Sequence, residues 1–300
     1  MGGKQVGLLL SDYDGTLCPT TSVSEDDSNS VGMIPNELEQ VLARISKHIV
    51  VCIISSKDFT FLHERTGFAN ILSCVLGIEI VIHNPHYKNN NKIDKFDCVR
   101  YQHLIASSHT LMDKSRLLHS IMKILQNQKH KDIMIEEKYD SAKEILFGLT
   151  IDYRHLQNWQ LFKENKEPSI REVIQRTINA NLVTSSPSKY RPFIQTYSSH
   201  PFLDVYGVEC NKGLAFENVI SQLEEKEERG TNVIYFGDSE NDNPAFRKSD
   251  ISIGIRSDKR LNPKLDCKYM LPFNQLPLFL RGLMDNDFVF VDSLLPNRPD

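Results

Sequence analysis

The stretch VGLLLSDYDGT, residues 6–16, decides the fold. Its first five residues form a continuous apolar run, which predicts a β-strand buried on both faces and ending in a loop at Gly15 and Thr16. If the chain stays extended past this strand, Asp12 and Asp14 point to the same side. Two carboxylates at the end of a buried strand repel each other. The pair therefore predicts a divalent cation, and Mg²⁺ suits oxygen ligands.

The composition argues against several classes of protein. Of the 300 residues, 25% are charged and the net charge is −4, which does not fit a protein held on nucleic acid by a broad basic face. No apolar run approaches a membrane span, and the first run is too short for a signal peptide. The six cysteines are scattered, without a zinc or redox motif. We expect a soluble cytoplasmic protein with a small-molecule partner, most simply a monomer.

Buried strands alternate with helices in the first 82 residues and again from residue 211, which is typical of an α/β fold with a parallel sheet. Polar segments at 20–32 and 84–91 predict a surface loop and a hairpin leading out of the sheet. The acids at 224–228 predict a solvated face, and the tail from Ser293 is expected to be loosely ordered. The expected strands are 6–10, 49–54, 71–76, 78–82, 233–236, 251–255 and 269–271, and the expected helices begin near 35, 59, 211 and 276.

The middle of the chain has a different pattern. Residues 111–125 and 170–178 have helical spacing, whereas 133–137 and 147–153 read as strands. This block, at about 105–205, predicts a separate α+β domain inserted into a core formed by 1–104 and 206–300.

Polar side chains stand at four strand ends or helix starts, and an open parallel sheet brings such positions to one crevice. A carboxylate there can attack phosphorus, while a cation, a lysine and a hydroxyl offset the phosphoryl charge. Each piece also has a structural alternative: the first acids as an Asx turn, Ser55 as a helix cap and Lys212 as a solvated lysine. An EF-hand is excluded by spacing at either acidic stretch. The four pieces are Asp12 with Asp14, Ser55, Lys212, and Asp238 with Asp242.

In this order the four pieces resemble the haloacid dehalogenase superfamily of phosphohydrolases, which implies a Rossmann-like core with an inserted cap. The resemblance implies that Asp12 is the nucleophile and Asp14 the general acid and base. It further implies that Asp238 binds Mg²⁺ together with the Asp12 carboxylate and the Asp14 backbone carbonyl, and that Asp242 supports this metal shell. The residues expected to contact the phosphoryl group are Ser55, Lys212, Thr16 and Ser56.

Two departures from the family pattern concern the second motif and the cap. Many relatives read Ser-Gly-Arg where this chain has residues 55–57 as Ser-Ser-Lys. The inserted block resembles a type-two cap, and three local stretches are similar to trehalose-phosphate phosphatases and related sugar phosphatases: 77–79, 135–138 and 152–154. The histidines of those relatives are replaced by Leu76 and Asp152.

The cap resemblance also suggests which residues contact the substrate. It implies that Glu136 and Lys138 reach sugar hydroxyls or phosphate, although an exposed charge pair on a strand is the alternative. Arg154 is expected to hold phosphate or to be structural. A lone tryptophan such as Trp159 is more often a core residue than a sugar contact.

These features predict a Mg²⁺-dependent sugar-phosphate phosphatase acting through an aspartyl phosphate, with trehalose 6-phosphate as the first choice of substrate. Sucrose phosphate or a mannosyl- or glucosyl-3-phosphoglycerate requires the same core and a different cap. A sugar phosphomutase is the nearest rival enzyme. A catalytically silent sugar-phosphate-binding protein is the non-enzymatic alternative.

Overall fold

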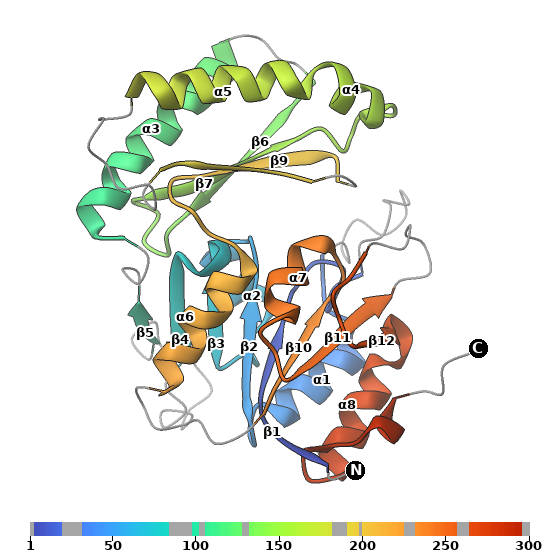
Figure 1. Ribbon diagram of the computed structural model, residues 1–300. Coiled ribbons are helices and arrows are strands. Elements are labelled where there is room, and N and C mark those ends of the chain that lie inside the picture. Colours follow the sequence, from blue (N-terminus) through green and yellow to red (C-terminus); the bar gives the residue numbers. More distant parts are fainter. Residues whose placement is uncertain are drawn as a thin grey trace. The chain divides into compact units, whose positions relative to one another are not determined.

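The computed structural model describes residues 3–19, 32–83, 98–101, 106–127, 132–181, 191–197, 200–224, 232–256 and 264–295. The chain divides into two compact units (Figure 1). The first comprises Met1–Tyr101 and Asn211–Asp300, and the second comprises Gln102–Cys210. Within the described ranges, no helix combines the length and the apolar character needed to cross a membrane.

The first unit is built on a sheet with the strand order β12-β11-β10-β1-β2-β3-β4-β5, and a short ninth strand pairs with the start of β1. The six strands from β12 to β3 are parallel. Their order places β1 at the centre, where Leu8, Leu9 and Leu10 are fully buried. The strand bounds are β1 Lys4–Ser11, β2 Val50–Ile54, β3 Ile71–Cys74, β4 Glu79–His83, β5 Cys98–Tyr101, β10 Asn232–Gly237, β11 Ile251–Arg256, β12 Tyr269–Pro272 and β13 Val289–Phe290.

Helices cover both faces of this sheet (Figure 1). Helices α6 and α7 share an apolar core with Leu8, Cys52 and Tyr235. On the other face, Phe279 of α8 packs edge-on against Phe236, and α1 lies beside α8. This arrangement buries the parallel strands on both sides, except for the edge strand β12, as the continuous apolar runs require. The helix bounds are α1 Asn36–Ile45, α2 Phe59–Arg65, α6 Lys212–Glu224, α7 Asn243–Phe246 and α8 Leu276–Asp285.

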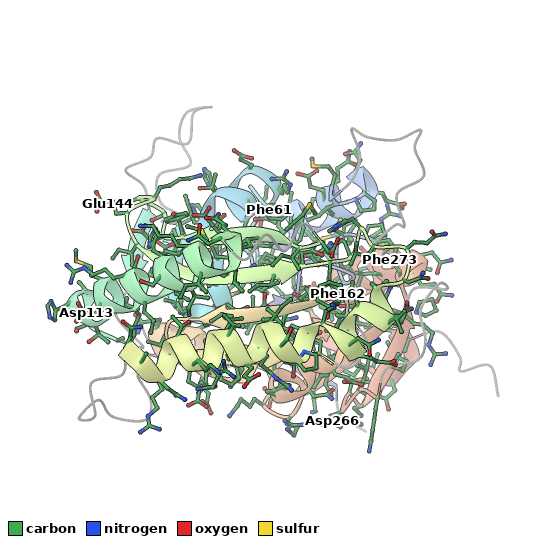
Figure 2. The ribbon with its side chains drawn as sticks, turned by 90° about the horizontal axis from the view of Figure 1, so that it is seen from above. Phe61, Asp113, Glu144, Phe162, Asp266 and Phe273 are labelled. Atoms are coloured by element: carbon green, nitrogen blue, oxygen red, sulfur yellow. The ribbon has the colours of Figure 1, made fainter. Side chains whose placement is uncertain are left out.

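The second unit is an antiparallel sheet in the order β6-β7-β9-β8, with helices on one face. Apolar side chains of α3 and α5 form a core with alternate residues of β7 and β9, among them Leu149 and Leu203. Figure 2, in which Phe162 of α4 is labelled, shows α3 and α5 lying side by side. The bounds are α3 Ser108–Asn127, β6 Met134–Tyr139, β7 Leu146–Asp152, α4 Trp159–Asn165, α5 Glu167–Asn181, β8 Phe193–Thr196 and β9 Phe202–Tyr206.

The expected fold class is confirmed: a mostly parallel α/β sheet is accompanied by a separate α+β unit. Some details of the prediction are wrong. Strand β4 runs antiparallel to β3, so the alternation of parallel strands ends there. The expected strand 71–76 ends at Cys74, because Val75 and Leu76 adopt positive φ angles of 45° and 55°. Among the described α-helices and strands, six were not predicted: β5, α4, β8, β9, α7 and β13.

Other expected features lie outside the described residues or close to their limits. The loop 20–32 and the hairpin 84–91 lie outside the described residues, apart from Gly32, and so does the acidic run after Glu224. The tail is more ordered than expected at its start, where Asp292–Leu294 forms a helical turn. Trp159 begins α4, a helix without any buried residue, so the expectation that it belongs to a core is wrong.

Candidate active site

Acidic, basic and hydroxyl side chains gather at the carboxyl edge of the parallel strands of the first unit. Asp12 directly follows β1, Ser55 follows β2 and Asp238 follows β10, while Lys212 opens α6. All four are at most 6% exposed. The Asp12 backbone N–H donates to the Phe236 carbonyl over 3.0 Å, which carries the β1–β10 pairing as far as the carboxylate. The neighbouring strand ends thus converge as the sequence predicts.

Lys212 forms a buried bridge between two of the acids. Its Nζ lies 2.9 Å from Asp12 Oδ1 and 2.7 Å from Asp242 Oδ1. Burial by itself lowers the pKa of Lys212, but the charges of Asp12 and Asp242 outweigh burial and raise the pKa above its usual value. Lys212 is therefore a permanent cation in this site.

Both carboxylate oxygens of Asp242 accept hydrogen bonds. Its Oδ1 accepts from Lys212 and from the Tyr235 hydroxyl, at 2.7 Å each. Its Oδ2 accepts from the backbone N–H groups of Asp238 and Ser239, at 3.1 and 3.0 Å, and from the Ser239 hydroxyl at 3.1 Å. With five donors on its two oxygen atoms, Asp242 fixes the turn after β10 and orients Lys212.

Three carboxylates of this edge fit a divalent cation. One oxygen each from Asp12, Asp238 and Asp242 lies within 4.8 Å of the others, and all three residues are buried. Burial raises the pKa of the Asp12 carboxyl well above its usual value; Lys212 opposes this shift, and Asp242 and Asp238 add to it. A hard cation offsets such crowding and suits an all-oxygen donor set. Because both oxygens of Asp242 accept from protein donors, Asp12 and Asp238 are better placed to contact the cation directly.

The loop after β1 approaches Asp238 so closely that only glycine fits at residue 15. Gly15 has φ +81°, and a Cβ there would lie 2.0 Å from Asp238 Oδ2. Thr16, the next residue, donates from its hydroxyl to Asp238 Oδ1 over 3.4 Å and is fully buried. The Gly-Thr pair thus fixes the distance between the Asp12 loop and Asp238.

Gly15→Ala should therefore lower kcat/KM by about a hundredfold, because an error of about 1 Å in the position of reacting groups has a cost of this size. Gly67→Ala is the matched control, since a Cβ at Gly67 would meet no atom within 4 Å. Steady-state kinetics and thermal melting of both variants test this. Full activity in Gly15→Ala would show that the loop tolerates displacement.

Ser55 is positioned by a hairpin turn with an uncommon backbone. Its N–H donates to the Ser73 carbonyl over 3.1 Å, and its carbonyl accepts from the Leu76 N–H over 2.9 Å. Leu76 and Val75 hold positive φ angles, which is strained for non-glycine residues. The Ser55 hydroxyl accepts from the Lys57 N–H over 3.2 Å, which leaves its proton to donate to a ligand oxygen.

The other expected residues of the core stand apart from this buried network. Asp14 is half-buried, and among the described residues its carboxylate makes no ion pair with Lys212. Ser56 is half-buried beside Ser55. Of the expected core residues, the structure therefore brings Asp12, Asp238, Asp242 and Lys212 into direct contact or metal-binding distance, with Thr16 on Asp238.

The expected cap residues form two ion pairs in the second unit. Lys138 is buried and its Nζ lies 3.3 Å from Glu136 Oε1. Arg154 is more than half exposed, and its Nε lies 2.6 Å from Asp152 Oδ2. Asp152, at the position where relatives have histidine, thus forms an ion pair with Arg154.

Two residues of the site, Ser239 and Tyr235, were not predicted from the sequence. Ser239 and Asp242 form a reciprocal capping box, a spacing that is recognisable as Ser-x-x-Asp. Tyr235 lies within an apolar run and has no sequence signal of its own, although its hydroxyl contacts Asp242.

Comparisons with known proteins identify the family and the fold of the chain. The profile of the haloacid dehalogenase-like hydrolases matches residues 9–266. No curated protein sequence matches the chain. Among solved structures, it is similar to a trehalose-6-phosphate phosphatase of Aspergillus fumigatus, with 17% identity, 94% of each chain covered and a TM-score of 0.52.

Two further solved structures share the fold. The C-terminal domain of the C. albicans trehalose-6-phosphate phosphatase has 19% identity and a TM-score of 0.58, with 94% of this chain and 93% of that chain covered. A sugar phosphatase of haloacid dehalogenase subclass IIB has 12% identity and a TM-score of 0.53, with 95% and 100% covered. The resemblance inferred from the motifs is confirmed, and the chain belongs to the haloacid dehalogenase-like hydrolases.

Proposed function

We propose that the chain is a Mg²⁺-dependent sugar-phosphate phosphatase in which Asp12 forms an aspartyl phosphate. The observation that carries this proposal is the buried contact of Asp12 with Lys212, next to Asp238 and Asp242. Lys212 fixes Asp12 Oδ1 over 2.9 Å. The other oxygen, Oδ2, is then the atom that attacks phosphorus.

The remaining residues have separate roles in phosphoryl transfer. Lys212 and Ser55 donate to oxygens of the phosphoryl group, which holds it against Asp12. Asp14 protonates the leaving sugar oxygen and then takes a proton from the water that hydrolyses the aspartyl phosphate. Its partial exposure, in contrast to buried Asp12, suits a group that exchanges protons.

The metal would be held by the carboxylates of Asp12 and Asp238 and the backbone carbonyl of Asp14, with Asp242 orienting the loop behind them. When bound, Mg²⁺ supplies positive charge that offsets the phosphoryl oxygens. Thr16 keeps Asp238 in place through its hydroxyl. Ser56 follows Ser55 and completes the set expected near the phosphoryl group.

The block at about 105–205 is proposed as the cap that selects the sugar, with Glu136, Lys138 and Arg154 as its contacts. Trehalose 6-phosphate is the first choice of substrate, supported by the similarity to trehalose-6-phosphate phosphatases. The proposed setting is cytoplasmic trehalose biosynthesis. Sucrose phosphate and glycosyl-phosphoglycerates use the same core chemistry and stay as alternatives.

A screen of phosphorylated sugars with Mg²⁺ and with EDTA tests the proposal. We expect the protein to release inorganic phosphate in Mg²⁺ and to lose at least about 99% of this activity in EDTA, because without the cation the anionic carboxylates repel the phosphoryl group. An isomeric sugar phosphate formed only with a bisphosphorylated activator would indicate the phosphomutase. The absence of turnover with every sugar phosphate in Mg²⁺ would favour the silent binding protein.

A further inference from the structure

The sheet of the second unit has one apolar and one polar face. Side chains of β6, β7 and β9 alternate, so Ile135, Ile151 and Val205 pack against the helices. Their neighbours along each strand point to the opposite face. This face, called the polar face below, carries Glu136 and Lys138 together with residues that the proposed function does not use. Among those residues are Thr150, Tyr197, Asp204 and Tyr206.

The four additional residues form one hydrogen-bonded cluster, the hydroxyl quartet. Asp204 Oδ2 accepts from the hydroxyls of Tyr197 and Tyr206, at 2.6 and 3.1 Å. Asp204 Oδ1 accepts from the hydroxyl of Thr150. All four residues are at most 7% exposed. Burial, and then the charge of Asp204, raise the pKa of both phenols well above the usual value, so the phenols keep their protons and donate them.

The quartet lies next to the expected cap residues in the strand register. Glu136 pairs with Thr150, which in turn pairs with Asp204. Two residues further along the strands, Lys138 pairs with Gly148, which in turn pairs with Tyr206. A Cβ on Gly148 would lie 2.8 Å from the Tyr206 ring. The missing side chain at Gly148 lets the aromatic ring lie over β7. The quartet and the Glu136–Lys138 pair thus form one continuous patch.

The chemistry of this patch is selective. Each hydroxyl of the quartet gives its only proton to Asp204, so its oxygen can only accept from a further partner. Two cations of the patch and its edge are already paired, Lys138 with Glu136 and Arg154 with Asp152. Within the described residues Asp204 forms no ion pair, and it accepts from three hydroxyls. The patch therefore favours hydrogen-bond donors and repels additional negative charge.

Resting on the proposed function, we propose that the hydroxyl quartet selects substrates whose leaving group is neutral and rich in hydroxyls, and disfavours leaving groups that carry a carboxylate. A sugar hydroxyl satisfies an acceptor oxygen by donating to it. A carboxylate has no proton to give, and like charges that face each other are costly. Among the substrates considered above, this favours trehalose and sucrose phosphates over glycosyl-phosphoglycerates.

The test compares kcat/KM for trehalose 6-phosphate and sucrose 6-phosphate with kcat/KM for glucosyl-3-phosphoglycerate, whose leaving group carries a carboxylate. We expect the better neutral substrate to be preferred by at least about tenfold, which corresponds to one charged hydrogen bond or a modest repulsion. In Asp204→Asn this preference should shrink by about tenfold, with a higher KM for the neutral substrate, because the carboxylate that polarises the hydroxyls is lost.

Tyr197→Phe should weaken the preference in the same direction. This variant keeps the aromatic ring and provides the test if Asp204→Asn does not fold. Tyr139→Phe is the matched control, since this phenol also donates to a carboxylate, Glu137, over 2.6 Å but packs on the helix side of the sheet. The control should keep the wild-type preference. Equal turnover of neutral and anionic substrates, or an unchanged preference in both quartet variants, would overturn the inference and leave the phosphatase intact. No turnover of any sugar phosphate would overturn both.

Discussion

We expect Asp12→Asn to abolish phosphate release, with kcat lowered by at least about a thousandfold, because the variant removes the proposed nucleophile. The amide has nearly the size of the carboxylate but does not attack phosphorus. It also withdraws one of the two carboxylate charges that would hold the metal, the other being that of Asp238. Steady-state phosphate release in Mg²⁺, with the sugar phosphate that the wild-type enzyme turns over best, measures the loss.

The fold of this variant should survive. The amide oxygen introduced at position 12 can still accept from Lys212, and the contact of Lys212 with Asp242 at 2.7 Å is unaffected. The variant also removes a buried negative charge whose burial is unfavourable. Its melting temperature should therefore stay close to that of the wild type. Asp266→Asn, an exposed acid paired with Arg247, controls for the change of carboxylate to amide and should keep full activity. If Asp12→Asn retained more than a few per cent of the activity, another residue would be the nucleophile.

The parallel core was predictable because its strands carry an unambiguous signal. Residues 6–10 and 49–54 are continuous apolar runs, and only a strand covered on both faces buries every residue of such a run. The polar residues that close these runs then had to meet at one edge of the sheet. This reasoning placed Asp12, Ser55 and Asp238 at the same edge from the sequence alone.

The second unit was less predictable because its strands are covered by helices on one face only. Residues 202–206 read FLDVY, a five-residue segment with an acid at its centre, which is too short for its pattern to identify a strand. The strand expected at 78–82 is present as β4, but its antiparallel direction was not foreseen, for a different reason. The turn before it uses positive φ angles at Val75 and Leu76, residue types that do not signal a turn.

The side-chain contacts of the site lay beyond sequence reasoning. The motifs name Asp242 and Lys212 but do not show that Lys212 bridges two acids or that Tyr235 completes the shell. Tyr235 belongs to an apolar run in which an aromatic residue is expected to be core. Its polar tip becomes part of the site only because the turn after β10 folds Asp242 back over the strand.

The bridging lysine leads to the largest expected effect on stability. Lys212→Ala should lower the free energy of unfolding by about 3–5 kcal/mol, because it leaves Asp12 and Asp242 buried without their shared cation. Lys248→Ala is the control. Lys248 forms an exposed pair with Glu217, and a surface pair contributes at most about 1 kcal/mol. Urea unfolding of both variants without metal provides the comparison.

The pH dependence separates a lost charge from a lost side chain. Without Lys212, the pKa of Asp12 rises further, because the lysine is the group that opposes the upward shift caused by burial. A folded-state pKa above the unfolded value means that the native state binds more protons, so stability falls as the pH rises through this window. The deficit of Lys212→Ala relative to the wild type should therefore shrink as the pH is lowered and Asp12 takes up a proton. A deficit that is constant with pH would show that the variant loses packing rather than charge compensation.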